Sequence, residues 1–200
     1  MSKLILASAS ARRREILSHI GLDYRAIVSD VDETSSLPAS PDKIVEELAR
    51  RKAEALLSHP DYNRGDIIVG SDTIVYYNGN TLTKPIDKDD AGRMLRELSG
   101  SLHMVYSGLC VTNGEKTVCT HALTKVKMRH ISEEEIYAYV KTGEPLDKAG
   151  SYGIQDLGGI FVEKIDGDYY NVVGLPLEKL CFILDKDFGY NVFEKRIDAK

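Results

Sequence analysis

The sequence predicts an α/β protein with a mixed central β-sheet flanked by helices, in a single domain over residues 1–200. Segments with the β-branched content of strands interleave with segments of helical periodicity along the chain. Two pairs of strand-like segments are each separated by a short turn, which is typical of antiparallel hairpins. A length of 200 residues with 42% hydrophobic content suffices for one sizeable core. Because hairpins accompany the interleaved helices, a mixed sheet is favoured over a purely parallel one.

Strands and helices alternate along the whole chain. Strands are predicted where β-branched residues gather, and helices where apolar residues recur every three or four positions. Between the two predicted hairpins, the glycine-rich residues 149–159 are expected to form a binding loop. In chain order, the predicted elements are a strand at 3–7, a helix at 12–20, a strand at 24–28, a helix from Ser40 and Pro41 to Leu57, a strand at 66–77, a helix from Asp87 that ends before Gly100, a hairpin of 103–112 and 117–128, a helix from Ser132 to Val140, a second hairpin of 161–165 and 169–173, and a helix from Pro176.

Polar residues with short side chains mark several of the helix starts. Ser40 and Asp87 are each suited to cap free N–H groups at the beginning of a helix. Ser132 and Glu135 have the spacing of a capping box, in which each side chain binds the backbone of the other residue. In the helix that begins near Ser40, Lys52 is expected on the polar side or its edge.

Composition and charge narrow the class of protein. The 26 basic and 31 acidic residues give a formal net charge of −5, which argues against broad attraction to nucleic acids or membrane surfaces. No stretch approaches the roughly 20 apolar residues that span a bilayer, so a soluble, unprocessed protein is expected. Cys110, Cys119 and Cys181 form no CxxC pair and are expected to be reduced thiols, which fits a reducing cytoplasm.

The segment from Ser8 to Arg13 joins the first strand to the first helix and is suited to bind an anion. Backbone N–H groups at the helix N-terminus, the hydroxyls of Ser8 and Ser10 and the guanidinium groups of Arg12 and Arg13 can point toward one phosphate chain. An ordinary capped helix with a solvated run of arginines explains the same residues, so the segment alone leaves both interpretations open.

Acidic and basic residues elsewhere offer candidates for catalysis. Asp72 lies within an apolar strand, where a carboxylate is hydrogen-bonded, metal-bound or functional, and a satisfied structural carboxylate is the alternative. Glu33, in the acidic run 30–33, could join Asp72 around Mg²⁺, although the run by itself favours a solvated acidic loop. Lys52 and Lys84 could bind phosphate or could be ordinary surface lysines.

The order of these motifs resembles the Maf family, the septum-formation-inhibitor-like nucleotide pyrophosphatases, across nearly the whole chain. The family pattern usually has proline after the second serine of its opening motif, where this chain has Ala11. The segments that carry the resemblance are Leu6–Arg13, Ala49–Ala53, Gly70–Val75, Lys84–Pro85, Leu98–Gly100, Asp147–Gln155 and Val173–Pro176.

The resemblance implies a fold and an activity. The fold would have two lobes around a nucleotide cleft, as in inosine triphosphate pyrophosphatases. The activity would be hydrolysis of dTTP and UTP to the monophosphate and pyrophosphate, in the branch that prefers these nucleotides, with modified or non-standard nucleotides as further candidates. A nucleotide-binding regulator of cell division or septum formation, with little turnover, is the alternative of a different class.

The resemblance also implies roles for individual residues. It suggests a divalent metal, Mg²⁺ with Mn²⁺ or Co²⁺ as alternatives, and allows a homodimer, which no periodic stripe in the sequence demonstrates. Thr73 and Gln155 would lie near a pyrimidine base. The implied residues are Asp72, Glu33, Lys52 and Lys84 for catalysis, Glu33 and Asp72 for the metal, and Ser8, Ser10, Arg12, Arg13, Thr73 and Gln155 for the substrate.

Overall fold

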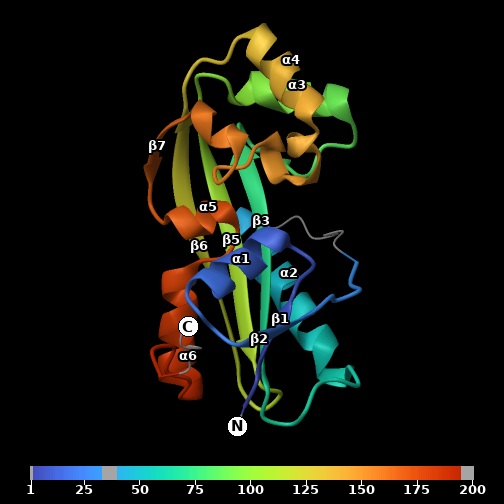
Figure 1. Cartoon of the computed structure of the whole chain (residues 1–200), viewed down its shortest axis with the longest axis vertical. Helices are drawn as coiled ribbons and strands as arrows, with labels where there is room; N and C mark the ends of the chain where they lie inside the picture. The colour runs from blue at the N-terminus through green and yellow to red at the C-terminus, as the bar shows by residue number, and fades with distance from the viewer. Residues whose placement is uncertain (1, 33–39, 195–200) are drawn as a thin grey trace. The chain divides into compact units, whose positions relative to one another are not determined.

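The computed structural model describes residues 2–32 and 40–194, and Figure 1 shows how its helices and strands follow one another along the chain. Within these residues seven strands form one sheet in the order β2-β1-β3-β5-β6-β7, with β4 paired to β3. Pairing is parallel for β1 with β2 and β3, and antiparallel for β3 with β4 and β6 with β7, which confirms the mixed sheet. The strands are β1 (Leu4–Ala7), β2 (Tyr24–Ile27), β3 (Ile67–Tyr77), β4 (Asn80–Leu82), β5 (Leu102–Thr112), β6 (Thr117–Met128) and β7 (Val162–Asp166).

Helices alternate with these strands along the chain, as the sequence predicts. No helix in the described part of the chain is both long enough and apolar enough to cross a membrane. The α-helices are α1 (Ala11–His19), α2 (Pro41–Ala55), α3 (Lys88–Leu98), α4 (Glu133–Thr142), α5 (Tyr169–Val173) and α6 (Leu177–Phe188), and the 3₁₀ helices are η1 (Leu56–Ser58), η2 (Glu144–Asp147), η3 (Ala149–Ser151) and η4 (Leu157–Phe161).

The chain forms two compact units, each built from separate stretches of sequence. The first unit comprises residues 1–72, 107–122 and 174–200, and the second comprises residues 73–106 and 123–173. Strands β3, β5 and β6 each contribute residues to both units. Each unit has a hydrophobic cluster of its own.

In the first unit, two glycines allow α2 to approach the sheet closely. A Cβ atom on Gly70 of β3 would overlap the carbonyl oxygen of Ala49, and one on Gly108 of β5 would overlap that of Val45. Both carbonyls belong to α2, so only residues without a side chain fit beneath this helix. The close approach places one face of α2 directly against the strand that carries Asp72.

In the second unit, α3 and α4 pack together over a core that includes Leu95, Leu98 and Ile136. The predicted caps of both helices are confirmed. The side chain of Asp87 accepts a hydrogen bond from Asp90 N, and Ser132 and Glu135 form the complete capping box. These local bonds satisfy N–H groups that would otherwise lack partners at the helix ends.

The second predicted hairpin is wrong in its second half. Val162–Asp166 is strand β7, and it pairs with β6 so that Ile165 lies opposite Val126. The residues predicted as the returning strand, 169–173, instead form the short helix α5.

Hydrogen bonds around Asn171 explain this helix. Its buried side-chain amide donates to the carbonyl of Val105 and to the hydroxyl of Thr124. The Thr124 hydroxyl in turn donates to the carbonyl of Asp168, and the Asp168 carboxylate accepts from the backbone N–H of Tyr170. An aspartate in this position caps the first turn of a helix, and this competes with the strand preference of the Tyr and Val residues that follow.

The predicted capping bond from Ser40 is also absent. Ser40 occupies the N-cap position of α2 with extended backbone, and Pro41 begins the helix as expected, but the Ser40 side chain makes no capping hydrogen bond. Its hydroxyl binds the carboxylate of Asp42 instead, and this bond lowers the pKa of Asp42. The Ser40 O–H donates in this bond, so the hydroxyl is oriented by the Asp42 side chain and makes no bond to the N–H groups of the first turn.

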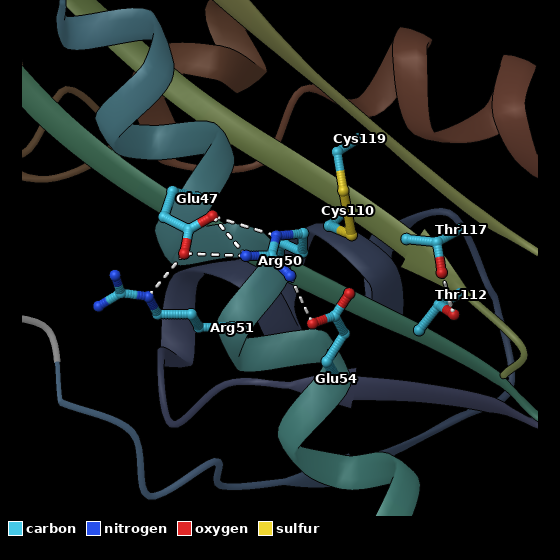
Figure 2. Close-up of polar contacts among 8 residues, drawn as sticks. All are labelled: Glu47, Arg50, Arg51, Glu54, Cys110, Thr112, Thr117 and Cys119. Carbon is cyan, nitrogen blue, oxygen red and sulfur yellow. Dashed lines mark hydrogen bonds and ion pairs between the residues drawn. A yellow bond between two sulfur atoms is a disulfide. The ribbon is translucent and has the colours of Figure 1, made fainter. Parts of the chain in front are cut away.

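The expectation of three reduced cysteines is wrong for two of them. Cys110 on β5 and Cys119 on β6 are joined by a disulfide, with Cα atoms 4.2 Å apart, and Figure 2 shows the bond between the two sulfur atoms. The hairpin formed by β5 and β6 brings these positions together although they are nine positions apart in sequence. Cys181 remains a free thiol, and burial raises its pKa.

Candidate functional site

The turn between β1 and α1 is folded by its own serine hydroxyls. The Ser8 hydroxyl accepts a hydrogen bond from the backbone N–H of Ser10 at 3.1 Å. Ser10 is the N-cap of α1, and its side chain accepts from the backbone N–H of Arg13 at 3.5 Å. Each hydroxyl keeps its own proton, so both can still donate to an anion at this helix N-terminus.

Arg13 is held rigidly in the first unit and is only 9% exposed. Its Nε–H donates to the carbonyl oxygen of Gly174 at 2.8 Å, and its Nη1 donates to the Ser8 hydroxyl at 3.2 Å. The fully buried Ser71 hydroxyl donates to the same Gly174 oxygen at 3.1 Å. A guanidinium group stays charged at neutral pH, so these bonds fix a buried positive charge beside the serine turn.

Lys52 and Asp72 form a buried ion pair, with 2.6 Å between Lys52 Nζ and Asp72 Oδ1. Lys52 is 7% exposed and Asp72 is 8% exposed. The expected placement of Lys52 on the polar side of its helix, or at the edge of that side, is therefore wrong. Lys52 lies one turn beyond Leu48 and beside Ala49 and Ala53, on the face of α2 that packs against β3. The pair satisfies a carboxylate that would otherwise be isolated within an apolar strand.

The two arginines before Lys52 have a different role from the lysine. Figure 2 shows Arg50 between two carboxylates of α2, with hydrogen bonds to Glu47 and Glu54. Arg51 donates to Glu47 at 2.8 Å. These side chains stabilise the exposed side of α2, and the shared Arg50 and Arg51 contacts lower the pKa of Glu47.

The remaining candidate residues are dispersed between the two units. Arg12 is partly buried in the first turn of α1, in the first unit. Thr73 is partly buried, and Lys84 and Gln155 are exposed, and all three belong to the second unit. Glu33 lies outside the described residues, so its predicted roles stay predictions.

A divalent metal is compatible with the Asp72 carboxylate. No group of three or more His, Cys, Asp or Glu side chains within residues 2–32 and 40–194 is arranged to hold a metal ion. Mg²⁺ commonly takes only one or two carboxylates and completes its shell with water and substrate phosphates. A carboxylate has about four lone-pair sites, so the bond from Lys52 leaves Asp72 with further acceptor capacity.

Two residues of this network had no role assigned from the sequence. Ser71 precedes Asp72 within an apolar strand. A buried serine needs a hydrogen-bond partner, so its presence in this strand could have indicated a polar contact. Gly174 contributes a backbone carbonyl, for which no side-chain pattern exists. The backbone φ of +123° at this position favours glycine, so the glycine itself is the only signal in the sequence.

The fold and the site define an α/β protein that presents buried, rigidly held positive charge at a strand–helix turn, beside a strand that bears a buried carboxylate. The Maf-like protein family matches residues 3–187, and this chain belongs to that family. The resemblance noted in the sequence motifs is therefore confirmed.

Relatives named dTTP/UTP pyrophosphatase match nearly the full chain. The protein of Alkaliphilus metalliredigens is 51% identical over 96% of this chain and 100% of its own length. Those of Thermococcus onnurineus and Bacillus cereus strain G9842 are both 48% identical, over 93% and 96% of this chain and 98% of their own lengths. The structure of the Staphylococcus aureus Ham1 protein aligns with 64% of this chain and 72% of its own, at 14% identity and a TM-score of 0.45, a likeness too low to define a fold.

Proposed function

We propose that this protein is a nucleoside triphosphate pyrophosphatase that hydrolyses dTTP and UTP to the monophosphate and pyrophosphate. One observation carries the proposal. Arg13 and Ser71 share the carbonyl of Gly174, and Ser71 directly precedes Asp72. The candidate phosphate-binding arginine is therefore tied to the strand that carries the candidate catalytic carboxylate. The relatives that bear this activity in their names support the choice of substrate.

In the proposed reaction, water attacks the α-phosphorus and the bond from that atom to the α–β bridging oxygen breaks. Pyrophosphate leaves with the bond electrons, and the Asp72 carboxylate accepts the proton of the attacking water. Lys52 holds that carboxylate in place through the buried ion pair. Arg13 and the serine turn bind phosphate oxygens and offset the charge that develops on the leaving group.

Mg²⁺, or Mn²⁺ or Co²⁺ in its place, would neutralise phosphate charge when bound, and Asp72 and Glu33 are the residues proposed to hold it. Lys84 and Arg12 are proposed as further phosphate contacts. Gln155 is proposed to recognise the base, because its amide can both accept from the imide N–H and donate to a carbonyl of uracil or thymine. Thr73 is proposed as a second contact on the base side.

Product identification across a panel of nucleotides tests this function. The protein is incubated with Mg²⁺, and in parallel with Mn²⁺ or Co²⁺, and with each of dTTP, UTP, dCTP, dATP, dGTP and modified pyrimidine triphosphates. The products are separated by ion exchange. We expect monophosphate and pyrophosphate in equal amounts, formed fastest from dTTP and UTP. Release of single phosphate would indicate a phosphatase. Nucleotide binding without products, under each of the three metals, would favour the regulatory alternative.

A further inference from the structure

Gln155 lies in a tightly closed turn of the glycine-rich loop. The backbone N–H of Asp156 donates to the carbonyl of Gly153 at 3.3 Å, so Ile154 and Gln155 occupy the two central positions. The arms of the loop touch through their backbones, since a Cβ atom on Gly158 would lie 2.7 Å from Gly153 N. The exposed Gln155 side chain therefore extends from a compact backbone turn.

The carboxylate of Glu144 binds the backbone of this turn. It accepts hydrogen bonds from the backbone N–H of Gly158 at 3.1 Å and of Leu157 at 3.2 Å. It also accepts from the hydroxyl of Tyr139 at 2.7 Å, and that hydroxyl accepts from the backbone N–H of Gly153 at 3.3 Å. Tyr139 thus holds Gly153 on one side of Gln155, and Glu144 holds Leu157 and Gly158 on the other side.

The two residues that hold the turn lie at the junction of α4 and η2. Tyr139 is in the last turns of α4, and Glu144 begins η2 directly after Gly143, the left-handed residue that ends α4. The Tyr139 ring packs edge-on against Phe161, with ring centroids 5.1 Å apart. Burial and the Glu144 carboxylate raise the pKa of Tyr139, so its hydroxyl keeps the proton that it donates.

We propose that Tyr139 and Glu144 are positioning residues that fix Gln155 for selection of the pyrimidine base. This inference rests on the proposed function of Gln155. Neither residue needs to touch the nucleotide, because both act through the backbone of the turn. A glutamine amide distinguishes uracil from cytosine only if its donor and its acceptor are held in one orientation. If the turn is looser, binding of uracil must also order the Gln155 side chain, and this entropic cost lowers the affinity for the preferred base.

Base-selective binding, measured without turnover, tests the proposal. Isothermal titration gives the Kd of the α,β-imido analogues of dUTP and dCTP for the full-length protein. Tyr139→Phe removes only the hydroxyl, and Tyr137→Phe makes the same change at a 72% exposed position of the same helix. Tyr139→Phe loses both hydrogen bonds of the hydroxyl. We expect it to lower the preference for the dUTP analogue about tenfold, and we expect Tyr137→Phe to leave that preference unchanged.

Gln155→Ala supplies a double-mutant cycle. If Tyr139 acts through Gln155, the double variant has the same base preference as Gln155→Ala alone. Glu144→Gln, which keeps one acceptor oxygen, should lower the preference in the same direction and serves if Tyr139→Phe does not fold. Equal weakening of both analogues by Tyr139→Phe, or additive effects with Gln155→Ala, would overturn the proposal.

Product analysis of the wild type separates this inference from the proposed function. If the wild type forms pyrophosphate from dTTP but Tyr139→Phe keeps full base preference, the positioning role fails and the function stands. If the wild type forms no pyrophosphate but its selective binding is lost in Tyr139→Phe, the function fails and the positioning role stands. A wild type that binds both analogues equally would refute the proposal.

Discussion

Replacing His103 with glutamine should make the protein less sensitive to acid. His103 lies on β5 and is 1% exposed, with its Nε2 atom 2.8 Å from the hydroxyl of Tyr152. Burial penalises the charged imidazolium and lowers the pKa of His103 from 6.5 to about 4. Glutamine retains a polar group that can bind Tyr152 but does not titrate, so the substitution isolates the proton-dependent part of the stability.

The sign and size of the effect follow from the two pKa values. Well above pH 6.5 the imidazole is neutral in both the folded and the unfolded chain. As the pH falls from 6.5 toward 4, the unfolded chain binds a proton that the folded chain excludes, so the free energy of unfolding decreases. A depression from 6.5 to about 4, at about 1.36 kcal/mol per unit, gives a loss of about 3 kcal/mol across this window.

Urea unfolding of the wild type and His103→Gln, in steps from pH 7 to pH 4, measures this loss. Carboxylates and the other histidines titrate in both proteins, so the difference between the two curves belongs to His103. We expect the wild type to lose about 3 kcal/mol more than the variant over the range. Parallel curves would refute the assignment of His103 as a neutral buried histidine.

Three further predictions concern single features of the structure. Asp72→Asn should lower the free energy of unfolding by about 3–5 kcal/mol, because Lys52 is then a buried charge without its carboxylate. In urea unfolding, adding Lys52→Met should recover most of this loss. A double variant no more stable than Asp72→Asn would count against the ion pair. Thiol titration of unfolded protein purified without reductant should detect only Cys181, with the other two thiols appearing after reduction, and full reactivity from the start would contradict the disulfide. Gly108→Ala should lower the thermal midpoint sharply, since its methyl group would overlap the backbone of α2. Gly92→Ala in α3 should be tolerated, because the nearest atom to its methyl group would be the end of the flexible Arg96 side chain and Ile136 would be at an ordinary contact distance of 3.8 Å. Similar midpoints for both variants would argue against the close helix approach.

Features that depend on nearby residues could be predicted from the sequence. The capping box of Ser132 and Glu135 and the cap from Asp87 were predicted because each involves residues only three positions apart. The hairpin of β5 and β6 was predicted from its Asn113 turn and the strand-like residues on each side. Two local predictions were wrong because other hydrogen bonds form there. Ser40 makes no capping bond, and residues 169–173 form the helix α5 in place of the predicted strand.

Features that depend on distant residues were beyond the sequence pattern. Lys52 has the charge of a surface residue, and only its pairing with Asp72, 20 positions later, makes its burial tolerable. The Ser8, Arg13 and Asp72 positions could be chosen in advance from their chemistry and from the family resemblance. The Gly174 carbonyl that links Arg13 to Ser71 could not, because every residue type supplies a carbonyl.

The bond between Arg13 and Gly174 also constrains when this protein can become functional during its synthesis. The two residues are 161 positions apart, and α6, which completes the first unit, is made after Gly174. A nascent chain therefore has all of the second unit outside the ribosome before Arg13 meets its acceptor. The arginine proposed to bind phosphate is therefore fixed only after every residue between Arg13 and Gly174 has been made.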